Sequence, residues 1–161
     1  MPVIEKFDVI IIGAGPSGAI AAGILIQKGW KVLVIEREEF PRFSIGESLL
    51  PQCMAFIEEA NMLDSVIEQA DDLGFQFKNG AAFYRNGERS SFDFTKKFSN
   101  GPGTTFQVKR ASFDKVLADR AEELGVDIRY KHNVTAVDFT DKAAIVSAEN
   151  EKNSLKFEAK F

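Results

Sequence analysis

The stretch "DVIIIGAGPSGAIAA", Asp8 to Ala22, dominates this sequence of 161 residues. A β-branched apolar run over Phe7–Ile12 leads into three glycines with G-x-G-x-x-G spacing, and small and apolar residues follow. This order predicts a buried parallel strand, a tight loop and a helix that begins near Pro16. In such a loop the first glycine allows a tight turn and the second lets a pyrophosphate approach the backbone. The third lets helix and strand pack closely.

A second strand is predicted by "KVLVIE", Lys31–Glu36, after Gly29 ends the helix. Glu36 stands at the end of this strand, 18 residues after Gly18. An acid at that place can accept hydrogen bonds from the hydroxyls of an adenosine ribose. The sequence therefore predicts a site for an adenine dinucleotide. An ordinary βαβ unit with a solvated glutamate is the alternative interpretation.

Composition and charge narrow the class of protein. Apolar residues make up 45% and charged residues 27%, which is typical of a globular domain. The net charge of −4 argues against nucleic acid as a partner. The uncharged run Val9–Gln27 contains "GAGPSG", which would break a membrane helix, so no transmembrane segment is expected. The N-terminus shows no signal-peptide pattern, and the single cysteine excludes an internal disulfide, so a cytoplasmic location is expected.

Two other residues could suggest chemistry, and the sequence favours a structural role for each. Cys53 lies among apolar residues at helical spacing and is expected to pack rather than react. His132 is the only histidine and has no partners at ligand spacing. No metal site is therefore predicted.

The rest of the chain does not continue as a simple series of alternating strands and helices. Asn86-Gly87 between two alternating runs predicts a β-hairpin. A helix is predicted from Phe113, Val116 and Leu117 on one face, with Gly125 as its end. After the strand "VDIRYKH", the runs "NVTAVDFT", "KAAIVSAEN" and "NSLKFEAKF" predict an antiparallel meander.

Together these motifs resemble the FAD-dependent oxidoreductases of the glutathione-reductase and p-hydroxybenzoate-hydroxylase type. The resemblance rests on "GAGPSG", "VIER" (Val34–Arg37), "QVKRASFDKVL" (Gln107–Leu117) and "NVTAV". The piece "PRFSIGESLLP" is similar to the branch that holds geranylgeranyl reductases and flavin-dependent halogenases. The resemblance implies an α/β fold, in which a Rossmann-like FAD-binding βαβ sheet carries an antiparallel three-stranded meander. Residues 1–161 would be the N-terminal part of an FAD-binding domain, 73–106 the first strands of an inserted β-rich substrate region, and the remainder of the enzyme would follow.

The resemblance also implies the cofactor site. FAD is the expected cofactor, with NAD(P)H as a candidate reductant. The glycine turn and the helix start would hold the pyrophosphate, and the acid and arginine after the second strand would hold the adenosine half. Arg42 and the turn "GES" would line the flavin side, and Arg110, with Gln107 beside it, would lie near the phosphates or the ribityl chain. Val134 would offer backbone groups to the adenine edge. The residues expected to bind FAD are Gly13, Gly15, Pro16, Ser17, Gly18, Glu36, Arg37, Arg42, Glu47, Ser48, Gln107, Arg110 and Val134.

The implied function is that of a flavoprotein monooxygenase, halogenase or reductase acting on an apolar or aromatic small molecule. Lys78 is the candidate catalytic residue, because its stretch resembles the one in which flavin-dependent halogenases keep an essential lysine. Arg85 departs from that resemblance, since such halogenases tend to carry tryptophan there. The alternatives are a non-catalytic binding protein on the same fold, like the Rab GDP-dissociation inhibitors, and an NAD-only dehydrogenase domain. The hairpin and meander disfavour the second alternative. The sequence leaves the substrate, the electron donor and the oligomeric state open.

Overall fold

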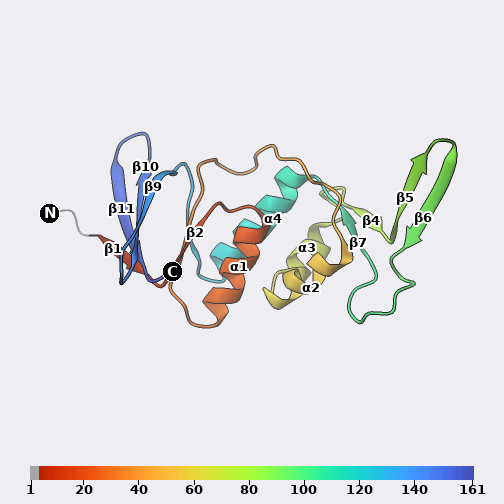
Figure 1. The fold of residues 1–161 in the computed structure, drawn as a ribbon, viewed down its shortest axis with the longest axis horizontal. Coiled ribbons are helices and arrows are strands. Elements are labelled where there is room, and N and C mark those ends of the chain that lie inside the picture. The colour runs from red at the N-terminus through yellow and green to blue at the C-terminus, as the bar shows by residue number, and fades with distance from the viewer. Residues whose placement is uncertain (1–3) are drawn as a thin grey trace.

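A parallel sheet organises the fold in the computed structural model, which describes residues 4–161. Its strand order is β2 (Val9–Ile12), β3 (Val32–Ile35) and β8 (Asp127–Arg129). Helices α1 (Pro16–Gln27) and α4 (Arg110–Glu123) pack together on one face of this sheet. A second sheet covers the other face, so this part of the molecule has three layers (Figure 1).

The strand β3 is buried on both faces, and its side chains alternate between two hydrophobic clusters. Val32 and Val34 belong to the cluster formed with the helices. Leu33 and Ile35 belong to the cluster formed with the second sheet, which includes the fully buried Phe157. This double burial explains why the run is apolar throughout rather than alternating.

The predicted first strand, Phe7–Ile12, is divided between the two sheets. Residues before Asp8 form β1 (Glu5–Phe7), which pairs in parallel with β11 (Ser154–Ala159), whereas β2 pairs with β3. The Asp8 carboxylate accepts hydrogen bonds from the Lys31 N–H at 3.0 Å and from Lys160 Nζ at 2.7 Å. The N-terminal segment therefore supplies one strand to each sheet, with an anchored aspartate at the break.

The second sheet contains the predicted meander. Strands β9 (Asn133–Phe139), β10 (Ala144–Glu149) and β11 pair antiparallel in succession, which confirms the prediction. The sheet has four strands rather than three, in the order β1-β11-β10-β9. The fourth strand, β1, comes from the divided N-terminal run. No helix between residues 4 and 161 is long and apolar enough to cross a membrane.

Two short helices and a small sheet lie beyond α4. The helices are α2 (Pro51–Glu59) and α3 (Leu63–Gln69), and α3 packs against α4. The small sheet pairs β4 (Gln76–Lys78) antiparallel with β7 (Thr105–Gln107). It joins the helical layer to the segment that extends from the end of the molecule (Figure 1).

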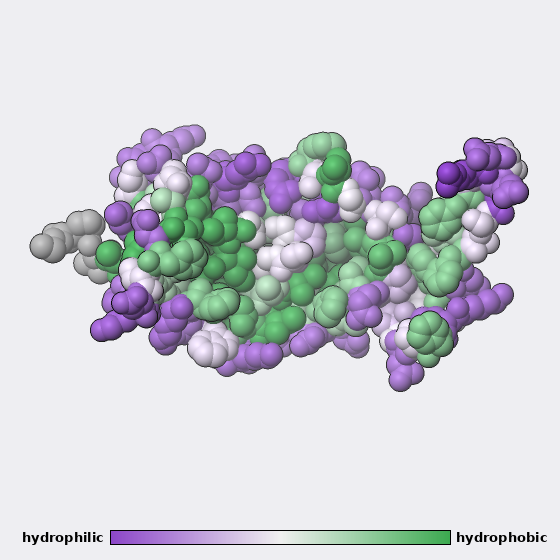
Figure 2. Space-filling view, viewed as in Figure 1, coloured by the Kyte–Doolittle hydropathy of each residue, from purple (hydrophilic) through white to green (hydrophobic). Residues whose placement is uncertain are grey.

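That extending segment is the predicted hairpin. Strands β5 (Gly80–Arg85) and β6 (Glu88–Asp93) pair antiparallel around Asn86 and Gly87, whose φ angles are 51° and 87°. Two consecutive positive φ angles are the requirement of the two-residue turn that matches strand twist, and Asn-Gly meets it. Figure 2 shows that the tip of this hairpin is hydrophilic.

Candidate functional site

The glycine turn between β2 and α1 is the first component of the site. Gly13 has a φ of +99°, in the left-handed region that favours glycine. A Cβ atom on Gly18 would overlap the carbonyl oxygen of Gly13, so helix and turn approach too closely for any side chain there. A Cβ atom on Gly15 would meet nothing nearer than Arg42 Nη2, at 3.6 Å. The backbone conformation therefore favours glycine at position 13 and packing requires it at position 18, whereas there is room for a side chain atom at position 15.

The start of α1 is open to an anion. Gly15 is the N-cap and Pro16 follows it, and no side chain caps the first-turn N–H groups. The first turn carries no acidic residue, and Ser17 is exposed. Unpaired N–H groups and the positive end of the helix dipole favour a phosphate at such a place.

Glu36 joins this turn to the end of β3. The residue is 4% exposed, and its carboxylate accepts hydrogen bonds from the Ala14 N–H at 2.8 Å and the Glu38 N–H at 2.9 Å. A carboxylate offers about four acceptor positions, so about two remain for a ligand hydroxyl. Glu36 is thus both a structural clamp on the glycine turn and an acceptor facing the cleft beside it.

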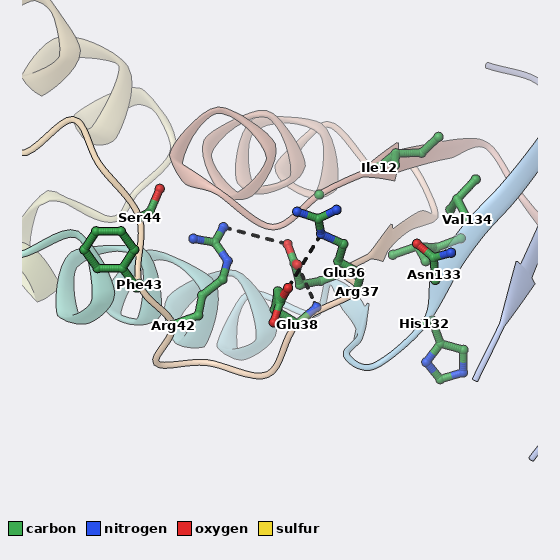
Figure 3. Close-up of a pocket in the computed structure, with 12 residues that line it drawn as sticks. Ile12, Glu36, Arg37, Glu38, Arg42, Phe43, Ser44, His132, Asn133 and Val134 are labelled. Carbon is green, nitrogen blue, oxygen red and sulfur yellow. Dashed lines mark hydrogen bonds and ion pairs between the residues drawn. The ribbon is translucent and has the colours of Figure 1, made fainter. Parts of the chain in front are cut away.

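A cleft of about 650 Å³ opens beside the turn (Figure 3). Five residues predicted to bind FAD line it: Gly13, Glu36, Arg37, Arg42 and Val134. The remaining walls come from the ends of β2 and β3, from the loop after β3 and from the residues that lead into β9. Sequence reasoning missed the following lining residues: Glu38, Phe43, Ser44, His132 and Asn133.

His132 is held at the rim of the cleft by its neighbours. Its Nδ1 lies 2.7 Å from the Tyr130 carbonyl oxygen, and its Nε2 lies 3.0 Å from Asn150 Nδ2. Because an amide nitrogen can only donate, Nε2 is the acceptor and Nδ1 carries the proton. Within residues 4–161, no three His, Cys, Asp or Glu side chains gather as metal ligands.

A buried carboxylate connects the cleft to the interior. Asp114 is fully buried in α4 and accepts hydrogen bonds from Arg110 Nε at 2.7 Å and from Arg42 Nη1 at 3.2 Å. Arg42 Nη2 lies 3.9 Å from Glu36 Oε2. The hydrogen bond with Asp114 raises the pKa of Arg110 above its usual value. Two carboxylates and two guanidinium groups therefore form one charge-balanced row.

Asp114 was not among the predicted site residues, although the sequence contains a signal for it. It lies four residues after Arg110 on a helix face shared with Phe113 and Leu117. A lone acid on an apolar helix face indicates a buried charge, and an arginine at that spacing supplies one partner. Nothing local in the sequence indicates the second partner, Arg42.

The "GES" turn lies at the other end of this row. Arg110 Nη1 donates a hydrogen bond to the Ile45 carbonyl oxygen at 2.5 Å, so Arg110 contacts the turn and is not part of the cleft lining. The Val108 N–H donates to the Glu47 carbonyl oxygen at 2.8 Å, and Ser48 forms a β-bridge with Gln107. The predicted residues Glu47, Ser48 and Gln107 therefore meet at β7 rather than at the glycine turn.

Lys78 reaches the same turn from β4. Its Nζ donates hydrogen bonds to Ser48 Oγ at 2.6 Å and to the Leu49 carbonyl oxygen at 2.8 Å. It also lies 5.4 Å from the ring centroid of Phe94. Nearby, Cys53 is half-buried, and burial raises the pKa of its thiol. The predicted site residues thus form two groups, one at the cleft and one at the "GES" turn, joined through Asp114.

Comparison with known proteins identifies the family. The FAD binding domain family matches residues 6–161. The chain belongs to this family. Its resident cofactor is therefore FAD, as the sequence predicted.

The described residues fit this cofactor. The space at Gly15, the uncapped start of α1 and the adjacent guanidinium of Arg42 suit a pyrophosphate. Arg42 therefore lies beside the glycine turn rather than with the "GES" turn on the flavin side, where the resemblance had placed it. The free acceptor positions of Glu36 suit a ribose. The FAD-binding domain thus has complementary groups for both parts of the adenosine-diphosphate half.

Individual relatives extend the resemblance to flavin-dependent halogenases. The chain is 36% identical over 134 residues to the flavin-dependent halogenase armH3 of Armillaria mellea, covering 83% of this chain and 26% of that protein. It is 32% identical over 163 residues to a tryptophan 2-halogenase of Chondromyces crocatus, covering 98% of this chain and 30% of that protein. The FAD-binding domain spans about a quarter of the length of several curated relatives it matches.

Solved structures show the same fold. A flavoprotein/dehydrogenase from Cytophaga hutchinsonii matches with a TM-score of 0.90 and 46% identity, covering 98% of this chain and 38% of that chain. The myxobacterial chondrochloren halogenase CndH matches with a TM-score of 0.83 and 37% identity, covering 98% of this chain and 36% of that chain. The Rossmann-like, halogenase-type α/β fold is therefore established for this domain.

Proposed function

We propose that the full-length protein is an FAD-dependent oxidoreductase that halogenates an aromatic small molecule, with Lys78 as its catalytic residue. The observation that carries this proposal is the contact between Lys78 Nζ and Ser48 Oγ at 2.6 Å. This contact joins the candidate lysine to the turn expected on the flavin side. The names of the relatives, which include halogenases from fungi and bacteria, support the same reaction class.

The geometry of Lys78 suits the transfer of a halogen. An ammonium group has three N–H donors, and two are used by Ser48 and the Leu49 carbonyl. One donor remains for a reactant. When bound, FAD would supply reducing electrons to O₂ so that halide is oxidised to hypohalous acid.

The remaining step transfers the halogen from hypohalous acid to the aromatic substrate beside Lys78. The free N–H of Lys78 donates a hydrogen bond to the oxygen of hypohalous acid. As the carbon–halogen bond forms, the oxygen–halogen bond breaks and the ammonium proton passes to the leaving oxygen, which departs as water. The displaced aromatic proton restores the ammonium group. Stabilising charge that develops on the leaving oxygen is a role for which a positioned cation is well suited.

The substrate region would begin with residues 73–106. Phe75 and Phe94 of this region are buried, but three phenylalanines on its strands are exposed: Phe77 at 67%, Phe83 at 60% and Phe92 at 57%. Exposed aromatic groups on paired strands suit one wall of a cavity for an apolar or aromatic substrate. The proposal extends to NAD(P)H as the source of electrons. It also extends to a cytoplasmic location, because the single thiol suits a reducing compartment.

The test uses the full-length protein with FAD, a flavin reductase and NADH, O₂, bromide and an electron-rich aromatic compound. Mass spectrometry should detect brominated product from wild type and none from Lys78→Ala. Lys97→Ala, in an exposed loop, is the matched control and should retain activity. Lys78→Ala should still reoxidise flavin and release hypobromous acid to a small-molecule trap.

Other outcomes would overturn the proposal in distinguishable ways. If wild type yields only hydroxylated product, the protein is a monooxygenase. If wild type brominates and Lys78→Ala does so equally well, halogenation stands but the lysine is only a structural link to Ser48. If wild type takes up FAD without oxidising any substrate offered, the non-catalytic binding protein gains support.

A further inference from the structure

In the row Glu36–Arg42–Asp114–Arg110, Asp114 is the one member that the sequence did not predict at the site. Asp114 is fully buried and does not line the cleft. It nevertheless binds Arg42 and Arg110, two of the three arginines that the sequence predicted at the cofactor. A buried carboxylate of this kind requires an explanation, because taking a charge out of water is unfavourable unless its partners compensate.

Arg42 needs an external anchor. It lies in the loop between β3 and α2, so neither a helix nor a strand fixes it. Its guanidinium contacts Asp114 at 3.2 Å, lies 3.9 Å from Glu36 and stacks 4.6 Å from the ring centroid of Phe40. Of these, the bond to Asp114 is the only one of hydrogen-bond length.

This anchor sets where the second nitrogen of Arg42 points. With Nη1 bound to Asp114, Nη2 lies 3.6 Å from the position that a Cβ atom on Gly15 would occupy. Gly15 is the N-cap of α1, and the helix has no side-chain cap. The guanidinium and the first-turn N–H groups therefore face the same space. Figure 3 shows Arg42 directed toward Glu36 at the edge of the cleft.

We propose that Asp114 is a positioning residue for the FAD diphosphate, which holds Arg42 in the orientation that completes the anion site at the start of α1. The proposal rests on the FAD-binding family and not on halogenation. Arg110 takes part as the second partner that neutralises the carboxylate. Its two hydrogen bonds with Asp114, at 2.7 Å and 3.0 Å, hold the carboxylate in place.

The proposal predicts a change in diphosphate affinity opposite to the change expected from net charge alone. Asp114 is itself an anion, so removing its charge should strengthen binding of a diphosphate if only net charge mattered. If Asp114 acts by orienting Arg42, removing it should weaken binding, because a preorganised donor is replaced by a mobile one. The two accounts predict opposite changes in affinity for the same substitution.

The experiment measures dissociation constants for FAD, ADP and adenosine with the full-length apoprotein, by calorimetry and flavin fluorescence. Asp114→Asn should weaken ADP and FAD binding at least tenfold and leave adenosine binding unchanged. Asp119→Asn is the matched control, because Asp119 lies on the same helix in a half-exposed pair with Lys115 at 2.6 Å. Unchanged or tighter ADP binding by Asp114→Asn would overturn the proposal.

A double-mutant cycle separates positioning from general damage to the fold. If Asp114 acts through Arg42, adding Asp114→Asn to Arg42→Ala should cause little further loss of ADP affinity. If the double variant instead shows the product of the two separate losses in ADP affinity, the proposal is overturned. If Asp114→Asn does not fold, Arg42→Lys gives an independent test, since lysine keeps the charge but cannot bind Asp114 and the glycine turn at once. Arg42→Lys should then bind ADP as weakly as Arg42→Ala, and wild-type affinity would refute the role of Asp114.

Discussion

Replacing Glu36 by alanine is expected to weaken both the fold and FAD binding, because one carboxylate serves the glycine turn and the ligand. Its hydrogen bond with the Ala14 N–H is buried, and leaving such a donor unpaired costs about 1–3 kcal/mol. The Glu38 N–H is only part-buried and can turn to water. With a typical urea dependence of about 1–3 kcal/mol per molar, the unfolding midpoint should fall by about 1 M.

The same substitution removes the acceptor for the ribose hydroxyls. Hydrogen bonds to a charged group are worth about 1.5–3 kcal/mol, so the dissociation constant for FAD should rise about tenfold to a hundredfold. Urea unfolding can be followed by Trp30, the only tryptophan, which lies between α1 and β3. FAD binding can be followed by quenching of flavin fluorescence in the absence of urea, where the variant remains folded.

Two further variants make this prediction specific. Glu36→Gln keeps one carbonyl acceptor, so its urea midpoint should lie between those of wild type and Glu36→Ala. Glu39→Ala removes an exposed carboxylate that pairs with Lys131 at 2.5 Å, and should change neither stability nor FAD binding. A wild-type urea midpoint for Glu36→Ala would refute the clamp, and wild-type FAD affinity would refute the ribose assignment.

Three other predictions concern the glycine turn, the second hydrophobic cluster and the cysteine. Gly18→Ala should lower the melting temperature sharply, because its Cβ would overlap the backbone of Gly13, whereas Gly15→Ala should melt as wild type and bind FAD more weakly; equal melting temperatures for both variants would contradict this. Phe157→Ala should lower the free energy of unfolding by about 3–5 kcal/mol in urea titration, since the ring is fully buried between the sheets, and a loss below 1 kcal/mol would show that the cluster is dispensable. Because burial raises the pKa of Cys53, its thiol should stay protonated at pH 8 and react with a maleimide or disulfide reagent more slowly than in urea-unfolded protein; equal reaction rates would contradict the assignment. Above the ordinary thiol pKa, ionisation of Cys53 in the unfolded state should also lower the free energy of unfolding.

The sequence alone determined the parts of this protein whose backbone conformation depends on adjacent residues. The glycine spacing and the apolar run before it predicted the turn at Gly13 and the start of α1, because a positive φ and a proline-led helix depend on adjacent residues. Asn86-Gly87 predicted the hairpin for the same reason, and the three alternating runs after His132 predicted the meander. Glu36 was predicted at the cleft because its distance from the turn is fixed by one helix and one strand.

Tertiary structure decided what depends on contacts between distant residues. The division of the first strand at Asp8 follows from anchoring by the Lys31 N–H and the Lys160 ammonium group, which lie far from Asp8 in the sequence. The separation of the predicted site residues into two groups follows from the pairing of the "GES" segment with β7. Asp114 reaches Arg42 across 72 positions of the chain, because α4 packs beside the loop after β3. The sequence alone identified the chemistry of the cofactor site, and the packing of distant elements determined which side chains hold one another within it.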